Sequence, residues 1–290
     1  MYVIAGVTGR VGSATARALL AAGADVRVLV RRPSDVPGWE ARGVEVRVVA
    51  LDDRSGLAAA LEGCTGFFTL LPFDLTVNDL DEHAERLTSS IAGAVADAKV
   101  PHVVMLSSGG ADLAEGTGPI TGLHLLEDAL RATGTTLTAL RSGHFQEKIG
   151  DVIVVAQESG IYPVFATSAD TPLAMVATAD LGIVAAQALE SRPTASESVD
   201  VIGPAYSERD VASLLGAAMG RELSVVTIPE ESWVEELTAA GFRPHIARSL
   251  AELYRADERG LLAPRGDRSV PAHTSLETTI KRVLALRAEV

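Results

Sequence analysis

Short apolar runs alternate with longer amphipathic segments along the first half of the chain. The runs are mostly apolar rather than strictly alternating, which is typical of strands buried on both faces of a parallel sheet. The segments between them are rich in Ala and Leu, and several end at a glycine, as helices commonly do. We expect strands at residues 2–6, 25–30, 44–49, 66–71, 102–106 and 135–140. We expect helices at residues 10–22, 56–62, 78–99 and 121–133.

Strands that alternate with helices predict an α/β fold, a doubly wound parallel Rossmann sheet with right-handed crossovers. After about residue 142 this rhythm changes, because prolines separate shorter elements. The expected elements there are helices at 211–219 and 231–240 and strands at 199–202 and 225–228. We therefore expect a Rossmann domain at residues 1–150. A smaller α+β substrate lobe is expected at 151–290, with some of its segments returning to the Rossmann sheet.

Three glycines, Gly6, Gly9 and Gly12, lie between the first expected strand and the first expected helix. At this spacing the first glycine permits a sharp turn, the second lets the backbone approach a pyrophosphate, and the third lets the helix pack closely on the sheet. The pyrophosphate then meets the helix N-terminus. The spacing alone also fits a flexible loop, but the strand before it and the helix after it favour a dinucleotide site. The expected cofactor-binding residues of this turn are Gly6, Thr8, Gly9, Arg10, Val11 and Gly12.

The end of the second expected strand carries Arg31 and Arg32 and no acidic residue. Proteins that bind NAD usually place an acidic residue there for the ribose 2′-hydroxyl, whereas guanidinium groups suit a 2′-phosphate. The pair therefore favours NADP(H) as the cofactor, with Arg10 adding to the same pocket. The alternative is that these arginines are ordinary solvated surface charges.

Charge and composition narrow the classes of partner. Hydrophobic residues make up 47% of the chain, and the formal net charge is 25 − 38 = −13. A surface this acidic repels a nucleic-acid backbone, although it leaves room for a local pocket for one phosphate. The chain has one cysteine, Cys64, and no His-x-x-x-His spacing, so we expect neither a disulfide nor a metal site.

No apolar run approaches the roughly 20 residues that a membrane span needs, and the first residues lack the basic region of a signal peptide. We expect a cytoplasmic protein that acts on a small molecule, with neither nucleic acid nor membrane as a partner. A monomer and a homodimer both remain open.

With these motifs, the chain resembles the NmrA-like family, a branch of the atypical short-chain dehydrogenases/reductases. The resemblance rests on an ordered series of segments that covers nearly the whole chain. These segments are 6–12, 28–33, 68–72, 102–108, 124–127, 137–145, 179–182, 201–204 and 220–221.

The resemblance implies a Rossmann fold with a small C-terminal substrate lobe. The family includes NADPH-dependent quinone and dye reductases, and also proteins that bind NAD(P) without catalysis and act as redox sensors. Two functions therefore stay open. One is direct hydride transfer from NADPH to a small conjugated acceptor of the quinone, azo, imine or enone type. The other is a non-catalytic NADP(H) sensor that regulates a partner protein; an epimerase or dehydratase is disfavoured because no acid–base pair is evident.

The sequence departs from the wider superfamily at its usual proton donor. Typical members carry a Tyr-x-x-x-Lys pair, but there is neither Tyr nor Lys between Glu115 and Arg131. The lysine that isoflavone reductases place shortly before this helix is also missing, because the sequence there reads Gly-Pro-Ile-Thr at 118–121.

Three residues remain as catalytic candidates. His124 lies near the start of a helix at the carboxyl edge of the sheet, and histidine exchanges protons near neutral pH. Lys148 stands where the family often has Asn, and Ser107 ends the fifth strand, where ligands bind in open α/β sheets. Each also has a structural interpretation: a capped surface histidine, a solvent-facing charge and a loop-capping hydroxyl.

Other candidates are expected to contact the cofactor or the substrate. Ser107 and Ser108 face the nicotinamide ribose or a substrate carbonyl, and Arg141 is expected to brace the site by pairing with a carboxylate. The expected cofactor contacts on the adenosine side are Leu70, Leu71 and Pro72, and the expected substrate contacts are His144, Phe145 and Gly109.

Overall fold

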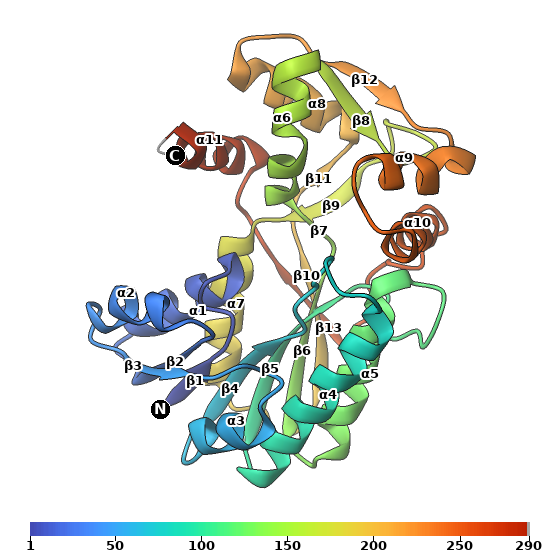
Figure 1. Ribbon diagram of the computed structural model, residues 1–290. Helices are drawn as coiled ribbons and strands as arrows, with labels where there is room; N and C mark the ends of the chain where they lie inside the picture. Colours follow the sequence, from blue (N-terminus) through green and yellow to red (C-terminus); the bar gives the residue numbers. More distant parts are fainter. Residues whose placement is uncertain (289–290) are drawn as a thin grey trace.

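The computed structural model describes residues 1–288 and places an eight-stranded parallel sheet in its lower part (Figure 1). The strand order is β13-β10-β6-β5-β4-β1-β2-β3. The strands are β1 (Tyr2–Ile4), β2 (Val26–Val30), β3 (Glu45–Val48), β4 (Gly66–Leu70), β5 (His102–Ser108), β6 (Thr136–Ser142), β10 (Glu197–Ile202) and β13 (Arg268–Pro271). The predicted doubly wound Rossmann fold is confirmed.

Helices cover both faces of this sheet, because its central strands are apolar on both sides. On one face lie α1 (Arg10–Ala21) and α7 (Thr178–Ser191), and on the other lie α3 (Arg54–Leu61), α4 (Leu80–Asp97) and α5 (Thr121–Ala132). All five residues of β2 are buried, as expected for an inner strand. The N-terminus of α4 is capped by Asp79, whose side chain accepts two backbone N–H groups.

The strand order reverses between β1 and β4. After β1 the chain proceeds outward to β2 and β3, returns to β4 on the other side of β1, and continues to β5 and β6. In open α/β sheets, ligands bind outside the carboxyl ends of the strands at such a switch point. Gly6 and Leu70 lie at this point, because Gly6 follows β1 and Leu70 ends β4.

A second lobe lies above the carboxyl edge of the sheet (Figure 1) and has its own apolar core. Its helices are α6 (Ile149–Ser159), α8 (Glu208–Met219), α9 (Trp233–Ala239), α10 (Pro244–Glu258) and α11 (Leu276–Ala288). Its strands form two small sheets, β11 (Ala205–Tyr206) with β9 (Leu173–Val176) and β7 (His144–Phe145), and β12 (Ser224–Thr227) with β8 (Ile161–Val164). Beyond residue 150, α7, β10 and β13 belong to the Rossmann part rather than to this lobe.

The strands and helices expected before residue 142 are all present, with ends shifted by at most two residues. The chain after residue 142 is more helical than the sequence indicated, because α6, α7, α10 and α11 were not expected. Prolines were the reason for expecting short elements there. Pro244 occupies the first position of α10, where proline begins a helix rather than breaking it. Within residues 1–288, no helix combines the length and the apolar character that a membrane crossing requires.

Candidate functional site

The glycine turn has the geometry that a dinucleotide phosphate requires. Gly6 has a φ of +66°, and the Gly9 N–H donates to its carbonyl at 2.9 Å. A Cβ atom on Gly12 would stand 2.5 Å from the carbonyl oxygen of Ala5 and would overlap that of Gly6. Only glycine therefore lets α1 begin this close to β1, which brings the helix N-terminus to the switch point.

The N-terminus of α1 is left open. Gly9 is its N-cap and offers no side-chain cap, and the first turn contains no acidic residue. Side chains cap α3, α4 and α8, whereas α5, α6 and α7 are uncapped like α1. What distinguishes α1 is that its open end follows the glycine turn at the switch point. Free N–H groups and the helix dipole at an uncapped end favour an anion. Thr8, Gly9 and Arg10 are exposed there, so the turn fits the phosphates of a dinucleotide.

The two arginines after β2 are not equivalent. Arg32 donates two hydrogen bonds to Asp35, at 3.1 and 3.2 Å, and its side chain is 73% exposed. Arg31 is exposed as well, and its charge reaches Asp74 in the loop after β4. The pKa of Asp74 is lowered mainly by hydrogen bonds from Thr76, with smaller contributions from the charges of His83 and Arg31. Arg31 is therefore the freer guanidinium for a 2′-phosphate.

The end of β4 sends its side chains to two different places. Leu70 touches Gly6, since a Cβ on Gly6 would overlap the Leu70 side chain, so Leu70 borders the turn as expected. Leu71 was expected to pack against the adenosine. Its side chain instead lies in the core, beside Ala84 of α4 and Gly122 of α5, because neighbouring strand residues point to opposite faces. Pro72 is half-buried and lines a small groove together with Leu71 and Phe73.

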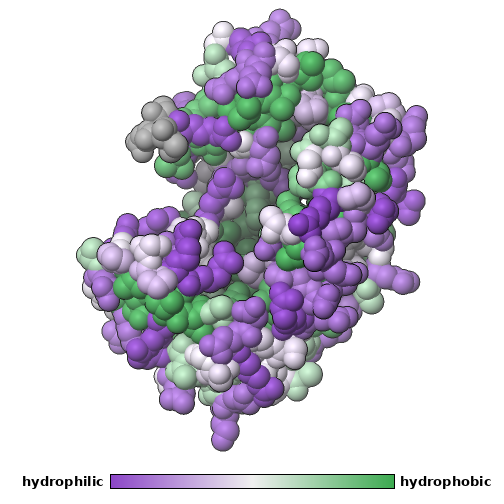
Figure 2. All heavy atoms as spheres, in the orientation of Figure 1, coloured by the Kyte–Doolittle hydropathy of each residue, from purple (hydrophilic) through white to green (hydrophobic). Residues whose placement is uncertain are grey.

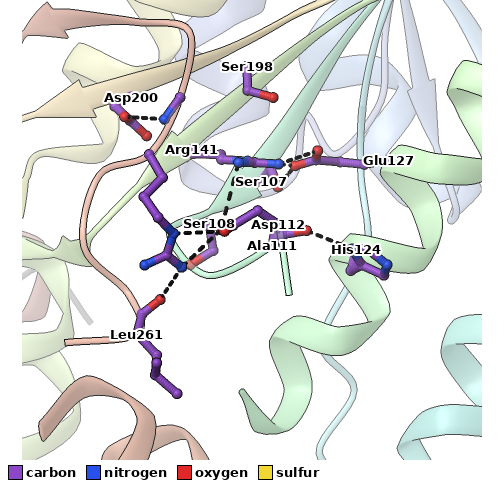
Figure 3. Close-up of polar contacts among 12 residues, drawn as sticks. Ser107, Ser108, Ala111, Asp112, His124, Glu127, Arg141, Ser198, Asp200 and Leu261 are labelled. Atoms are coloured by element: carbon purple, nitrogen blue, oxygen red, sulfur yellow. Dashed lines mark hydrogen bonds and ion pairs between the residues drawn. The ribbon is translucent and has the colours of Figure 1, made fainter. Parts of the chain in front are cut away.

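A buried carboxylate, Glu127 of α5, organises the ends of β5 and β6 (Figure 3). It accepts hydrogen bonds from Arg141 at 3.0 and 2.7 Å, from Arg131 at 2.9 Å and from the Ser107 hydroxyl at 2.6 Å. Burial alone would raise the pKa of Glu127, but these three donors outweigh it and lower the pKa. The expectation that Arg141 pairs with a carboxylate is confirmed. The Ser107 proton is already donated to Glu127, so this hydroxyl is left as an acceptor.

The segment between α10 and β13 packs against the loop after β5 and against the first four residues of β10. Arg265 donates to Asp112 at 2.7 and 3.1 Å, and the Gly266 N–H donates to Asp200 at 2.7 Å (Figure 3). The carbonyl of Leu262 lies directly against Gly109, where a Cβ would overlap it. Gly109 was expected to contact the substrate, but in this structure it is buried under Leu262.

The structure fixes the ring orientation of His124, the fourth residue of α5. Its Nδ1 lies 2.9 Å from the carbonyl oxygen of Ala111, in the loop after β5. A carbonyl only accepts, so Nδ1 carries a hydrogen and donates it. Nε2 lies 3.4 Å from Asp128 Oδ2, one turn further along the helix. Nε2 is therefore the ring nitrogen that is not committed to the backbone.

His144, Phe145 and Lys148 follow β6, where the chain passes from the sheet into the second lobe. His144 Nε2 lies 2.9 Å from Asp257 of α10, which ties the junction to that helix. Phe145 is half-buried, and Lys148 is exposed at the start of α6. Ser108 donates to the Ser142 carbonyl across the strand ends, at 3.4 Å.

Sequence reasoning missed Glu127, Asp112 and Arg265 as parts of this site. The contacts that Glu127 makes with Arg141 and Asp112 with Arg265 join residues 14 and 153 positions apart, so no local pattern signals them. Two signals were available. Arg141 at the end of an apolar strand required a carboxylate from somewhere in the fold, and Glu127 stands four residues before Arg131 on the same helix.

The surface is hollowed between the two parts of the molecule, and apolar residues lie deep in this hollow (Figure 2). In the orientation shared with Figure 1, the hollow opens between the helices beside β1 and the second lobe. It therefore lies above the switch point of the sheet.

A parallel sheet with an uncapped glycine turn at its switch point defines the Rossmann class of dinucleotide-binding proteins. The model of the NmrA-like family matches residues 2–277, and the chain belongs to this family. An NAD(P)H azoreductase of Xenophilus azovorans is 28% identical over 257 residues, covering 88% of this chain and 86% of that protein.

Solved structures share the fold. The triphenylmethane reductase of Citrobacter sp., crystallised with NADP(H), has a TM-score of 0.79 at 20% identity, covering 97% of this chain and 99% of that one. An NADPH-dependent quinone oxidoreductase of Escherichia coli, in complex with NADPH, has a TM-score of 0.76 at 19% identity, covering 98% and 100% of the two chains.

Proposed function

We propose that this protein is an NADPH-dependent reductase of a small conjugated acceptor of the quinone, azo, imine or enone type. The observation that carries the proposal is the uncapped glycine turn at the sheet's switch point, below an apolar-floored hollow. The azoreductase, triphenylmethane reductase and quinone oxidoreductase among its relatives support this choice of chemistry.

The residues present fit NADP(H). The N–H groups at the start of α1 hold the diphosphate, Arg31 holds the 2′-phosphate, and Leu70 borders the adenosine side. When bound, the nicotinamide supplies the hydride, so the protein has to position the acceptor and exclude water. The apolar floor of the hollow suits a flat conjugated molecule and keeps water away from it.

The proton that balances the hydride comes from His124 or from solvent. Ser107 is a poor donor, because its proton is committed to Glu127 at 2.6 Å. In His124 the Ala111 carbonyl fixes Nδ1 as a donor, so the proton for the product leaves from Nε2. Lys148, exposed at the N-terminus of α6, would hold an acidic acceptor.

His124→Ala should lower kcat by about 100-fold, a typical contribution of a general acid. The affinity for NADPH should stay unchanged, because His124 lies on α5 and the phosphate turn lies on α1. Steady-state rates with an accepted quinone or azo dye, with cofactor titration in parallel, measure both quantities. Leu125→Ala, a change at the exposed neighbour on the same helix, is the control. An unchanged kcat in the His124 variant would assign the proton to solvent.

A second candidate is a non-catalytic NADP(H) sensor. The observation that favours it is the absence of both Tyr and Lys between Glu115 and Arg131, where the superfamily's usual proton donor stands. The two functions separate in one assay, in which NADPH is mixed with the protein and a panel of quinones, azo dyes, imines and enones. Loss of the reduced-nicotinamide absorbance with at least one acceptor supports the reductase. Tight NADPH binding with no oxidation by any of them supports the sensor.

A further inference from the structure

Two arginines from different parts of the molecule meet at Gly150, near the start of α6. Arg287 of α11 donates from Nη2 to the Gly150 carbonyl at 2.6 Å. Arg10, the first residue of α1, has its Nη2 atom 3.9 Å from the position that a Cβ on Gly150 would occupy. Arg287 and Gly150 both belong to the second lobe, so the contact between the two parts of the molecule here is the one from Arg10 to α6.

The observed position of Arg10 differs from the expectation based on the sequence, which placed Arg10 in the 2′-phosphate pocket after β2. The Arg10 guanidinium lies against α6 instead. Arg31 and Arg32 remain at the end of β2. The arginines therefore form two separate groups, Arg31 with Arg32 and Arg10 with Arg287.

Within residues 1–288, no ion pair neutralises the charge of Arg10 or of Arg287. Neither guanidinium has a carboxylate oxygen within 4.0 Å in the part of the chain that the structure describes, and Arg10 makes no side-chain hydrogen bond there. The carboxylate nearest in sequence to Gly150 is Asp151, and its charge acts on Tyr254 of α10. Two like charges without a counter-ion repel each other, and an oxyanion between them removes that repulsion. Most of the ten N–H donors of the two groups are free to bind one.

The position of Arg10 and Arg287 indicates which anion they bind, the diphosphate of the cofactor or an anionic group of the acceptor. Arg10 directly follows Gly9, so its guanidinium extends from the same backbone whose N–H groups face the phosphate. The acceptor candidates Ser107 and His124 belong to β5 and α5, and β4 separates β5 from β1 in the sheet. Lys148, the candidate for holding an acidic acceptor, stands two residues before Gly150, so such an acceptor is the competing ligand. The direct bond between Gly9 and Arg10 favours the diphosphate.

We propose that Arg10 and Arg287 together bind the diphosphate of the dinucleotide, so that α11 of the second lobe completes the cofactor site. The inference rests on the proposed function for the identity of the ligand. Guanidinium groups bind phosphate oxygens in a bidentate, charge-assisted manner, and a diphosphate presents oxygens to both lobes at once. The cofactor then bridges the two lobes and holds them at a fixed distance above the sheet.

Arg287→Met should weaken the binding of NADPH and of NADH alike, each by about 10-fold, because both dinucleotides carry the diphosphate. Titration of nicotinamide fluorescence measures both affinities without any acceptor. Arg287→Lys should recover much of the loss, because it restores the charge. Lys281→Met, an exposed change on the same helix, is the matched control and should leave both affinities unchanged. The wild-type affinity should also fall with salt more steeply than that of the Arg287→Met variant.

Unchanged affinities in a folded Arg287→Met variant would overturn the inference. So would a loss confined to NADPH, which would place Arg287 at the 2′-phosphate. An effect confined to the KM of an acidic acceptor would overturn it too, because the anion would then belong to the substrate. If the wild-type protein itself bound neither dinucleotide, the proposed function would fail instead.

Discussion

Glu127→Gln should lower the free energy of unfolding by about 3–5 kcal/mol, the usual cost of breaking a buried ion pair from one side. Glu127 is 1% exposed and is the common acceptor for Arg141, Arg131 and Ser107. Its removal leaves the Arg141 guanidinium, itself 7% exposed, without its bidentate partner. A neutral amide cannot replace two charge-assisted hydrogen bonds.

The loss should depend on pH in a defined direction. Folding lowers the pKa of Glu127 from its usual value of 4.5. A carboxyl with a lowered folded pKa contributes stability that is fully present above the unfolded value and is lost as pH falls through the folded value. The difference between wild type and Glu127→Gln should therefore be largest above about pH 5 and shrink below it.

Chemical denaturation at several pH values measures this difference. Asp170→Asn is the matched control, because it breaks an ion pair with Arg209 in which both side chains are more than half exposed. The control should change stability far less. Equal losses in the two variants, or a Glu127→Gln loss that does not vary with pH, would show that the buried network contributes nothing special.

Arg31→Ala should raise the KM for NADPH by about 10-fold or more and leave the KM for NADH nearly unchanged. Arg31 is exposed at the end of β2, and no acidic residue follows it until Asp35, which is engaged by Arg32. A 2′-phosphate at this place would lose its charge-assisted partner in the variant, while the 2′-hydroxyl of NADH had none to lose.

Arg32→Ala is the control for this prediction. Arg32 already donates two hydrogen bonds to Asp35, so its removal should affect NADPH less than the removal of Arg31. Initial rates with each cofactor at a fixed, saturating acceptor concentration give the four values. Equal effects of Arg31→Ala on both cofactors would contradict the assignment of the 2′-phosphate to this arginine.

The first half of the fold was predictable because each element there carries its own local signal. The apolar run 26–30 and the stop at Gly23 define β2 and α1 without help from the rest of the chain. The second half of the fold was harder to predict, because residue types that commonly end a helix, such as proline, begin a helix there. Pro244 opens α10, and the segment 149–159 is so apolar that its helical period is obscured.

The residues of the candidate site also fall into a group that local sequence predicted and a group that it did not. The glycine turn and the arginines after β2 are local in sequence, so their spacing predicted them. The roles of Ser107, Leu71 and Gly109 depend on partners far along the chain, namely Glu127, the α4–α5 core and Leu262. Such partners follow from topology, which brings together residues that no short pattern connects.

The central claim is that NADPH binds at the glycine turn, between the sheet and the second lobe. A crystal structure of the protein with NADPH tests it most directly. The account predicts a diphosphate on the N–H groups at the start of α1, a 2′-phosphate beside Arg31, and a nicotinamide toward the ends of β5 and β6. A dinucleotide bound elsewhere, or a turn that stays free of ligand at saturating NADPH, would contradict it.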